Sequence, residues 1–231
     1  MSSRYDCFLW FLFTNGFSKD GLIYKKMGEN MGLENTRGKK LLYHLTKVDN
    51  MESIIKNGLL PRKRVKQYNL NFGDVADSQI IEKRTEHGLD SYTPFHFHPY
   101  SAFDVAVKNT YPNDKFVYIC IKRALAKFNE FKILPMHPLS SDEVMLYKYD
   151  DGMNIIDWDT MESVGTNDEY SKNVKMAECL TEKCIPADLF QCVYVPDEET
   201  KEYIEELLRA NGIIEQPPYV SVQEKWFQIG G

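Results

Sequence analysis

In the first part of the chain, the pattern of hydrophobic and polar positions predicts a short strand followed mainly by helices. The strand is the largely apolar run LLYHLT at 41–46. Asp49 and Glu52 match a capping box, which predicts that a helix begins there and ends at Gly58. Two more helices are expected, one over 77–88 with Ile80 and Ile81 facing the core, and one from Ser101 with Asp104 in its first turn and Phe103, Ala106 and Val107 buried.

Strands dominate the second part of the chain. Apolar runs rich in β-branched and aromatic residues predict strands at 115–122, 131–135, 143–149, 174–180 and 190–195. A helix is expected over 197–210, with acidic residues in its first turn and Gly212 after its end. This order indicates an α+β fold with a mixed or antiparallel sheet. The polar stretch 150–173 predicts a long functional loop.

Two polar residues interrupt the first strand. Because side chains alternate between the two faces of a strand, Leu42, His44 and Thr46 share one face. A buried histidine that is bonded to a neighbouring group explains this pattern, and so does a pair of ligand-binding side chains. Taken alone, the segment favours the buried histidine.

Glu178 has a similar position in the expected strand 174–180. It would share a face with Val174, Met176 and Leu180. A buried carboxylate is costly unless it is paired or hydrogen-bonded. Either this face is exposed to solvent, or Glu178 is an acid in an active-site cleft, where such groups gather.

Positive charge is concentrated in the segment 53–73, which contains no acidic residue. Its charged and aromatic members are Lys56, Arg62, Lys63, Arg64, Lys66, Tyr68 and Phe72. Cations that contact phosphates and aromatic rings that stack on bases are the combination that binds single-stranded nucleic acid. A solvated charged loop is an equally good interpretation.

Composition places the chain among soluble globular proteins. It has 231 residues, 43% of them hydrophobic and 27% charged, with a net charge of −6. Such a chain is not a basic nucleic-acid coat, so any contact with phosphates depends on a local patch. The apolar run at 7–13 is too short to span a bilayer, and no membrane association is expected.

Cysteine and histidine patterns argue against structural crosslinks and metals. The five cysteines are odd in number and form no C-x-x-C pair, which favours a reducing compartment and hence the cytoplasm. His96 and His98 form an H-x-H pair that a metal could use, but spacing supplies no third ligand. No metal site is therefore expected.

Three sequence blocks occur in an order that is known from one protein family. They are YHLTKVDNMESIIKNGLL from residue 43, YTPFHFHPYSAFDVAV from residue 92 and KMAECL from residue 175. Together they resemble the DarT family of DNA ADP-ribosyltransferase toxins. The resemblance covers 41–195 and rests on all three blocks.

The resemblance implies an ADP-ribosyltransferase fold, in which a split sheet holds NAD as co-substrate in its cleft. It implies a single catalytic domain over 41–231, preceded by an N-terminal extension at 1–40. The implied reaction transfers ADP-ribose to a base in single-stranded DNA. The implied partners are NAD, single-stranded DNA and a cognate antitoxin that hydrolyses the modification.

The same blocks imply roles for individual residues. Glu178 matches the catalytic glutamate, and His44 and Thr46 match the H-x-T positions that contact NAD. Arg84 best matches the family's active-site arginine, although the adjacent Lys83 fits that position too. Further NAD contacts are expected at Tyr43 and Gly58, DNA contacts at Arg62, Lys63, Arg64, Lys66 and Tyr68, and a substrate-recognition loop at 150–173.

The acceptor is the least determined part of this interpretation. The form PFHF with a following FD resembles the guanine-modifying branch of the family, so guanine is favoured over thymine. An ADP-ribosyltransferase that acts on protein or RNA is an alternative. A non-catalytic module that binds single-stranded nucleic acid through 53–73 is another, although such a module has no use for a lone acid on an apolar face.

Overall fold

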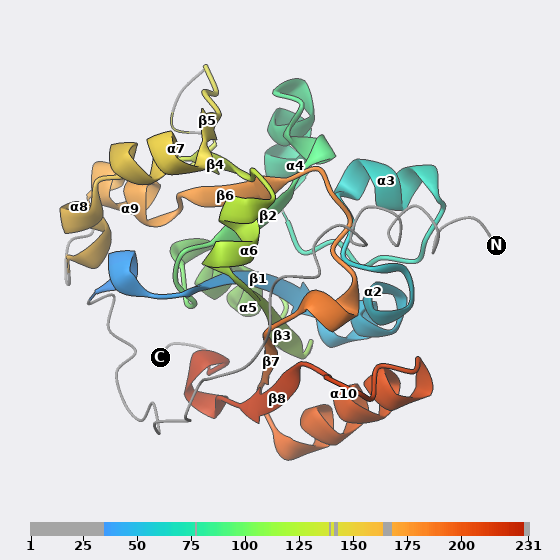
Figure 1. Cartoon of the computed structure of the whole chain (residues 1–231). Coiled ribbons are helices and arrows are strands. Elements are labelled where there is room, and N and C mark those ends of the chain that lie inside the picture. Colours follow the sequence, from blue (N-terminus) through green and yellow to red (C-terminus); the bar gives the residue numbers. More distant parts are fainter. Residues whose placement is uncertain (1–34, 77, 139, 141–142, 164–167, 229–231) are drawn as a thin grey trace.

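The computed structural model describes residues 35–76, 78–138, 140, 143–163 and 168–228, and within them an eight-stranded sheet runs in the order β5-β4-β6-β2-β1-β3-β7-β8 (Figure 1). Its strands are β1 (Leu41–Lys47), β2 (Thr93–His96), β3 (Phe116–Lys122), β4 (Lys132–Leu134), β5 (Tyr147–Lys148), β6 (Glu178–Thr181), β7 (Cys192–Val195) and β8 (Tyr219–Val222). Neighbours are antiparallel except β7 and β8, which are parallel. The expected α+β fold with a mixed sheet is confirmed.

The sheet opens between its two central strands. Whereas β1 pairs with β3 along its whole length, its register with β2 has a single pair, Tyr43 with His96. On the other side of β2, residues Thr93 to His96 all pair with β6. The sheet therefore consists of two halves that are joined at one point, as the expected split sheet requires.

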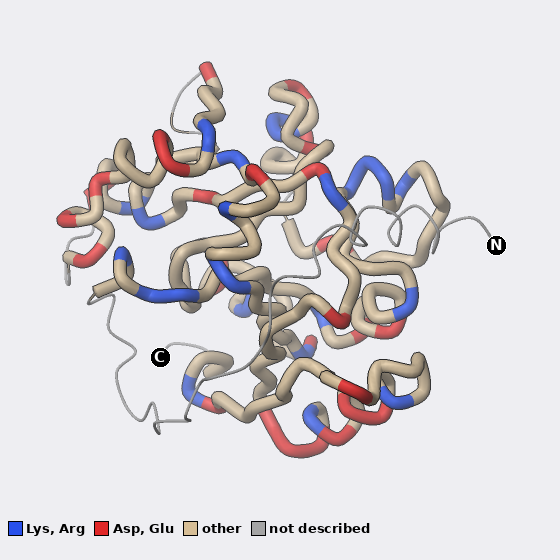
Figure 2. The backbone as a smooth tube through the Cα atoms, viewed as in Figure 1, with Lys and Arg blue, Asp and Glu red and all other residues tan. Residues whose placement is uncertain are grey.

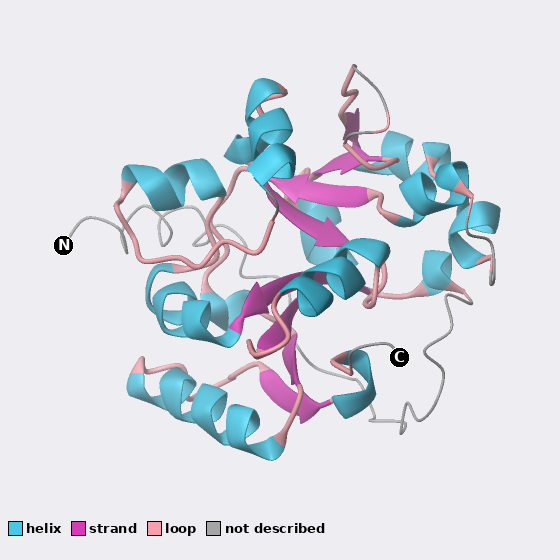
Figure 3. Ribbon diagram, turned by 180° about the vertical axis from the view of Figure 1, so that it is seen from behind, coloured by secondary structure: helices cyan, strands magenta, loops and turns pink. Residues whose placement is uncertain are grey.

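Helices cover both faces of this sheet (Figure 3). They are α2 (Met51–Asn57), α3 (Arg62–Gln67), α4 (Ser78–Glu86), α5 (Ala102–Thr110), α6 (Arg123–Phe128), α7 (Tyr149–Ile155), α8 (Trp158–Glu162), α9 (Glu169–Lys175) and α10 (Glu198–Ala210). The larger hydrophobic cluster includes residues of α2, α8 and α10 together with one face of β1, β3 and β7. None of the helices in the described ranges is long and apolar enough to cross a membrane.

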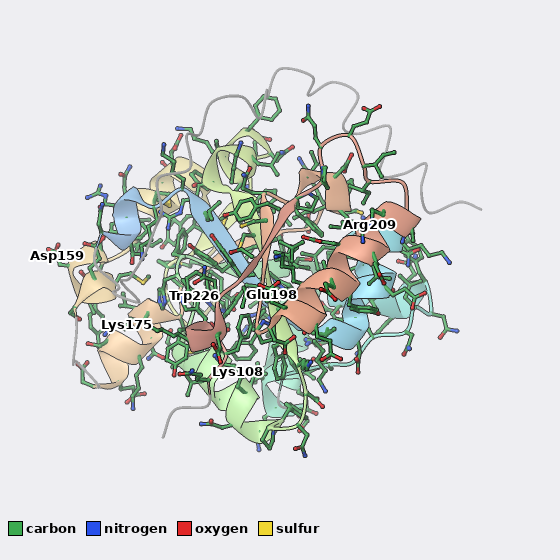
Figure 4. All side chains as sticks on the ribbon, turned by 90° about the horizontal axis from the view of Figure 1, so that it is seen from below. Lys108, Asp159, Lys175, Glu198, Arg209 and Trp226 are labelled. Carbon is green, nitrogen blue, oxygen red and sulfur yellow. The ribbon has the colours of Figure 1, made fainter. Side chains whose placement is uncertain are left out.

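A second cluster covers the opposite face, where α5 and the C-terminal segment pack. Its aromatic members include Tyr43, Tyr118 and Trp226, whose ring centroids lie 6.0–6.4 Å apart in pairs. Lys108 of α5 is 3% exposed and donates a hydrogen bond to the carbonyl oxygen of Trp226. Figure 4 shows these two labelled residues near each other, seen from below.

The expected helices of the first part are present, with corrections in detail. Gly58 ends α2 with a φ of 83°, and Ser101 with Asp104 forms the expected capping box of α5. The Asp49–Glu52 capping box is wrong, because Asp49 lies inside a 3₁₀ turn and Asn50 precedes the helix without a side-chain cap. The isoleucines of α4 are only half-buried, its buried residue is Arg84, and Ala106 of α5 is exposed.

Strand 174–180 is the main error in the second part of the chain. Its first residues belong to α9, because Asp168 caps that helix by accepting a hydrogen bond from the Ser171 N–H at 3.0 Å. Only from Glu178 does the chain enter β6. The supposed face shared by Val174 and Glu178 therefore does not exist, although both residues are buried.

The expected strand 143–149 and the expected loop 150–173 are also wrong in large part. Only Tyr147 and Lys148 form β5, and α7, α8 and α9 occupy most of the following stretch. Asp150 and Asp151 lie in the first turn of α7, where acidic side chains favour a helix. Asp157 caps α8 by accepting from the Thr160 N–H at 3.0 Å. These helix-start signals outweigh the polar character of the segment.

The N-terminal extension is described only from residue 35, so the apolar run 7–13 lies outside the described residues. Residues 35–40 contact the domain directly. Thr36 is fully buried, and the Arg123 side chain donates to the carbonyl oxygen of Arg37 at 3.0 Å. The boundary at residue 40 stays a prediction.

Candidate active site

A buried ion pair joins Glu178 to Arg84. Glu178 is the first residue of β6 and is 5% exposed. Arg84 reaches it from the last turns of α4, and its Nη1 donates to Oε1 at 2.8 Å and to Oε2 at 2.9 Å. The adjacent Lys83 is exposed. Glu178 is thus neither in solvent nor alone, and Arg84 rather than Lys83 is its partner.

The pair lines a cavity at the opening between the two halves of the sheet. Its wall includes the polar or charged side chains of His44, Thr46, Arg62, Arg84, His96 and Glu178. The segment that connects α3 to α4 contributes Phe72, Asp74, Val75 and Ala76. The structure therefore brings together four residues that the sequence assigned to the site from separate segments, namely His44, Thr46, Arg84 and Glu178.

His44 is held as a neutral hydrogen-bond acceptor. Its Nδ1 lies 2.8 Å from the carbonyl oxygen of Pro94, so this nitrogen carries the proton and donates it. Burial lowers the pKa of His44 to about 4. At neutral pH the remaining ring nitrogen, Nε2, therefore keeps its lone pair. The earlier alternatives are both partly right, since His44 is bonded to a neighbour and lines the cavity.

Two buried polar atoms near the ion pair have no hydrogen-bond partner within the described ranges. They are Arg84 Nη2 and His96 Nδ1. Buried polar groups are normally hydrogen-bonded, so each is a candidate to bind a polar group of a ligand. Because Nη1 of Arg84 already neutralises Glu178, its Nη2 can donate to a second acceptor.

His96 was considered in the sequence only as part of a metal-binding pair. It pairs in register with Glu178 across β2 and β6, which no local pattern could reveal. His98 instead lies with its ring nitrogens 3.0 Å from the carbonyl oxygens of Pro99 and Lys175, where it connects the chain after β2 to α9. No cluster of metal-ligating side chains occurs among the residues described.

Two predicted NAD contacts lie away from the cavity. Tyr43 faces the aromatic cluster, because alternation along β1 places it opposite His44, and burial raises its pKa strongly. Gly58 packs against Cys184, where a Cβ atom would lie 2.4 Å from the sulfur. Neither residue lines the cavity, and Gly58 ends α2, so their assignment as NAD contacts stays a prediction.

The predicted DNA-binding residues divide into two groups. Arg62 lies in the cavity wall, where its Nη2 contacts Asp74 Oδ1 at 2.6 Å. Lys63, Lys66 and Tyr68 are exposed on or just after α3, and Figure 2 shows this helix as a positively charged stretch. Arg64 lies over the ring of Tyr68 at 5.5 Å and donates to its hydroxyl at 3.1 Å.

Known proteins resemble this chain in sequence. The family model for "ssDNA thymidine ADP-ribosyltransferase, DarT" matches residues 43–228. A DNA ADP-ribosyl transferase–DNA ADP-ribosyl glycohydrolase fusion protein of Thermosipho africanus is 24% identical over 182 residues, which are 74% of this chain and 46% of the relative. The chain thus spans about half the length of that relative.

Solved structures show the same fold. The DarT of Thermus sp. 2.9 in complex with ADP-ribosylated ssDNA is 18% identical, with a TM-score of 0.69 over 82% of this chain and 96% of that one. The DarTG of Thermosipho africanus in complex with ADP-ribose is 23% identical, with a TM-score of 0.67 over 82% of this chain and 51% of that one.

Proposed function

This chain belongs to the DarT family, whose model covers most of its length, and we propose that it transfers ADP-ribose from NAD to a base in single-stranded DNA. The observation that carries the proposal is the Arg84–Glu178 pair, which lies in a cavity between the two halves of a split sheet. The solved complexes of relatives with ADP-ribose and with ADP-ribosylated ssDNA support NAD and DNA as substrates.

In the proposed reaction, the bond between nicotinamide and C1″ of its ribose breaks, and the electron pair leaves with nicotinamide. A nitrogen lone pair of the acceptor base forms the new bond to C1″, and the base loses a proton. Positive charge develops on the ribose, as in glycoside hydrolysis. The Glu178 carboxylate would stabilise this charge and accept a hydrogen bond from a ribose hydroxyl.

The neighbouring residues would bind and orient the substrates. The Nε2 lone pair of His44 suits a donor such as a ribose hydroxyl or the carboxamide N–H of nicotinamide. The unpartnered Nη2 of Arg84 suits a carbonyl or phosphate oxygen. The exposed cations Lys63 and Lys66 on α3 would contact the phosphates of the DNA strand that enters the cavity.

The description of the matching family names thymidine, which supports thymine as the acceptor base. Guanine, which the form PFHF favours, is the second candidate. The fusion of a related transferase to an ADP-ribosyl glycohydrolase supports a toxin role, in which such a hydrolase reverses the modification. Co-expression with a DNA ADP-ribosyl glycohydrolase should then restore growth of cells that the chain arrests.

The proposal is tested by incubating the purified protein with NAD and a set of single-stranded oligonucleotides, each of which lacks one base. We expect the mass of the DNA to increase by one ADP-ribose, and the oligonucleotide without the acceptor base to stay unmodified. Glu178→Gln should abolish the product, whereas Glu206→Gln, at an exposed position of α10, should not change it. Modification of protein or RNA but not DNA, or equal activity of Glu178→Gln, would contradict the proposal.

A further inference from the structure

Asn50 lies buried between β1 and the opposite wall of the cavity. It precedes α2 and is 2% exposed. Its Nδ2 donates to Thr46 Oγ1 at 3.1 Å and to the carbonyl oxygen of Gly73 at 3.0 Å, and its Oδ1 accepts from the Gly73 N–H at 2.8 Å. One side chain thus connects Thr46 to the segment 72–76, whose other residues line the cavity.

Gly73 determines the orientation of the Asn50 amide. A backbone N–H can only donate and a carbonyl oxygen can only accept, so the amide oxygen faces the former and the amino group the latter. The same amino group directs its second proton at Thr46. The Thr46 oxygen is therefore the acceptor in this contact.

The consequence for Thr46 is a hydroxyl proton that Asn50 does not use. Thr46 is 1% exposed and lines the cavity, so its hydroxyl can donate this proton to a ligand there. Without Asn50, the hydroxyl could rotate and act either as donor or as acceptor. The contact occupies one of the two lone pairs of the Thr46 oxygen and so orients the hydroxyl for donation before the ligand arrives.

We propose that Asn50 is a positioning residue for NAD, which orients the Thr46 hydroxyl to donate a hydrogen bond to the bound co-substrate. The matching acceptor on NAD is an oxygen, such as the carbonyl of the nicotinamide carboxamide or a ribose oxygen. This inference rests on the proposed function, because it takes NAD as the ligand. Asn50 itself does not touch the reacting atoms.

Asn50→Asp tests the proposal with almost no change in shape. A carboxylate keeps the acceptor for the Gly73 N–H but has no donor for Thr46 or for the Gly73 carbonyl oxygen. The Thr46 hydroxyl then donates to the carboxylate, and NAD loses its donor. We expect NAD to bind about tenfold more weakly, the usual effect of one lost hydrogen bond. In steady-state assays KM for NAD should rise while kcat changes little.

Three further variants distinguish positioning from a structural role. Thr46→Val should weaken NAD binding about as much as Asn50→Asp, and the double variant should bind no more weakly than Thr46→Val alone, since Asn50 acts through Thr46. Asn129→Asp is the matched control. Asn129 is 4% exposed, donates to the Leu125 carbonyl oxygen at 2.9 Å and lies outside the cavity wall, so NAD affinity should stay unchanged.

Calorimetric titration with NAD in the absence of DNA measures the affinities, and a thermal unfolding midpoint for each variant verifies that it is folded. Wild-type affinity in Asn50→Asp would overturn the inference, and so would additive losses in the double variant. A wild-type protein that does not bind NAD would overturn the proposed function together with it. If the wild-type protein binds NAD and Asn50→Asp binds it equally well, only the positioning role of Asn50 is overturned.

Discussion

The ion pair between Arg84 and Glu178 should be costly to break even when no substrate is present. The two side chains are only 7% and 6% exposed, and one nitrogen of Arg84 contacts both carboxylate oxygens. Removal of one partner leaves the other charge buried and uncompensated, at a cost of about 3–5 kcal/mol. We expect Glu178→Ala and Arg84→Ala each to lower the free energy of unfolding by that amount.

The same effect can be expressed as a thermal shift. In a domain of this size, 1 kcal/mol corresponds to about 2–4 °C, so each single variant should unfold about 6–20 °C below the wild type. The double variant Arg84→Met/Glu178→Leu removes both charges and retains apolar volume. It should unfold at a higher temperature than either alanine variant, because no unpaired charge remains.

Scanning calorimetry without NAD or DNA is the assay, and an exposed ion pair is the control. Lys127 and Asp150 also lie 2.8 Å apart, but their side chains are 60% and 66% exposed. Lys127→Ala should therefore cost less than about 1 kcal/mol. If Glu178→Ala unfolded at the same temperature as Lys127→Ala, the reasoning that burial makes the Arg84–Glu178 pair costly to break would be refuted.

Three further predictions concern other parts of the molecule. Burial lowers the pKa of His44 to about 4, and His44 is proposed to bind NAD in its neutral form. NAD affinity should therefore stay level as pH falls through 6.5 and decrease only as it approaches 4, and a midpoint near 6.5 in titrations would contradict this. Gly58→Ala should lower the unfolding midpoint more than Gly88→Ala, because both have positive φ but only at Gly58 would the new Cβ collide with a sulfur, at 2.4 Å. The double variant Lys63→Ser/Lys66→Ser should weaken the salt dependence of single-stranded DNA binding. If both lysines contact phosphates, the slope of log affinity against log salt concentration should change by about 1.4. An unchanged slope in anisotropy titrations would mean that the DNA binds elsewhere.

Local patterns in the sequence predicted those elements whose signals lie within a few residues. The strand at 41–47 and the end of α2 at Gly58 follow from an apolar run and from a residue type that tolerates positive φ. The segment 174–180 contains the boundary between α9 and β6, so period-2 alternation does not hold across it. The cap that marks the start of this helix, Asp168, lies outside the segment.

The partners of the site residues could not be predicted, because they are distant in the sequence. Glu178 and Arg84 are 94 positions apart, and the carbonyl oxygen that holds His44 belongs to Pro94, 50 positions away. Only the family resemblance suggested that Arg84 and Glu178 share a site. Physical reasoning on single segments identified Glu178 as unusual but left its environment open.

The split between β1 and β2 explains how residues on opposite faces of the sheet can line one cavity. In register, Tyr43, His96 and Glu178 lie in one row across three strands and so share a face of the sheet. His44 and Thr46 point to the other face, yet they line the same cavity as His96 and Glu178. A continuous sheet would separate these two sets by the thickness of its backbone. They meet because β1 and β2 pair at a single point, so that side chains from both faces reach the gap that opens beside it.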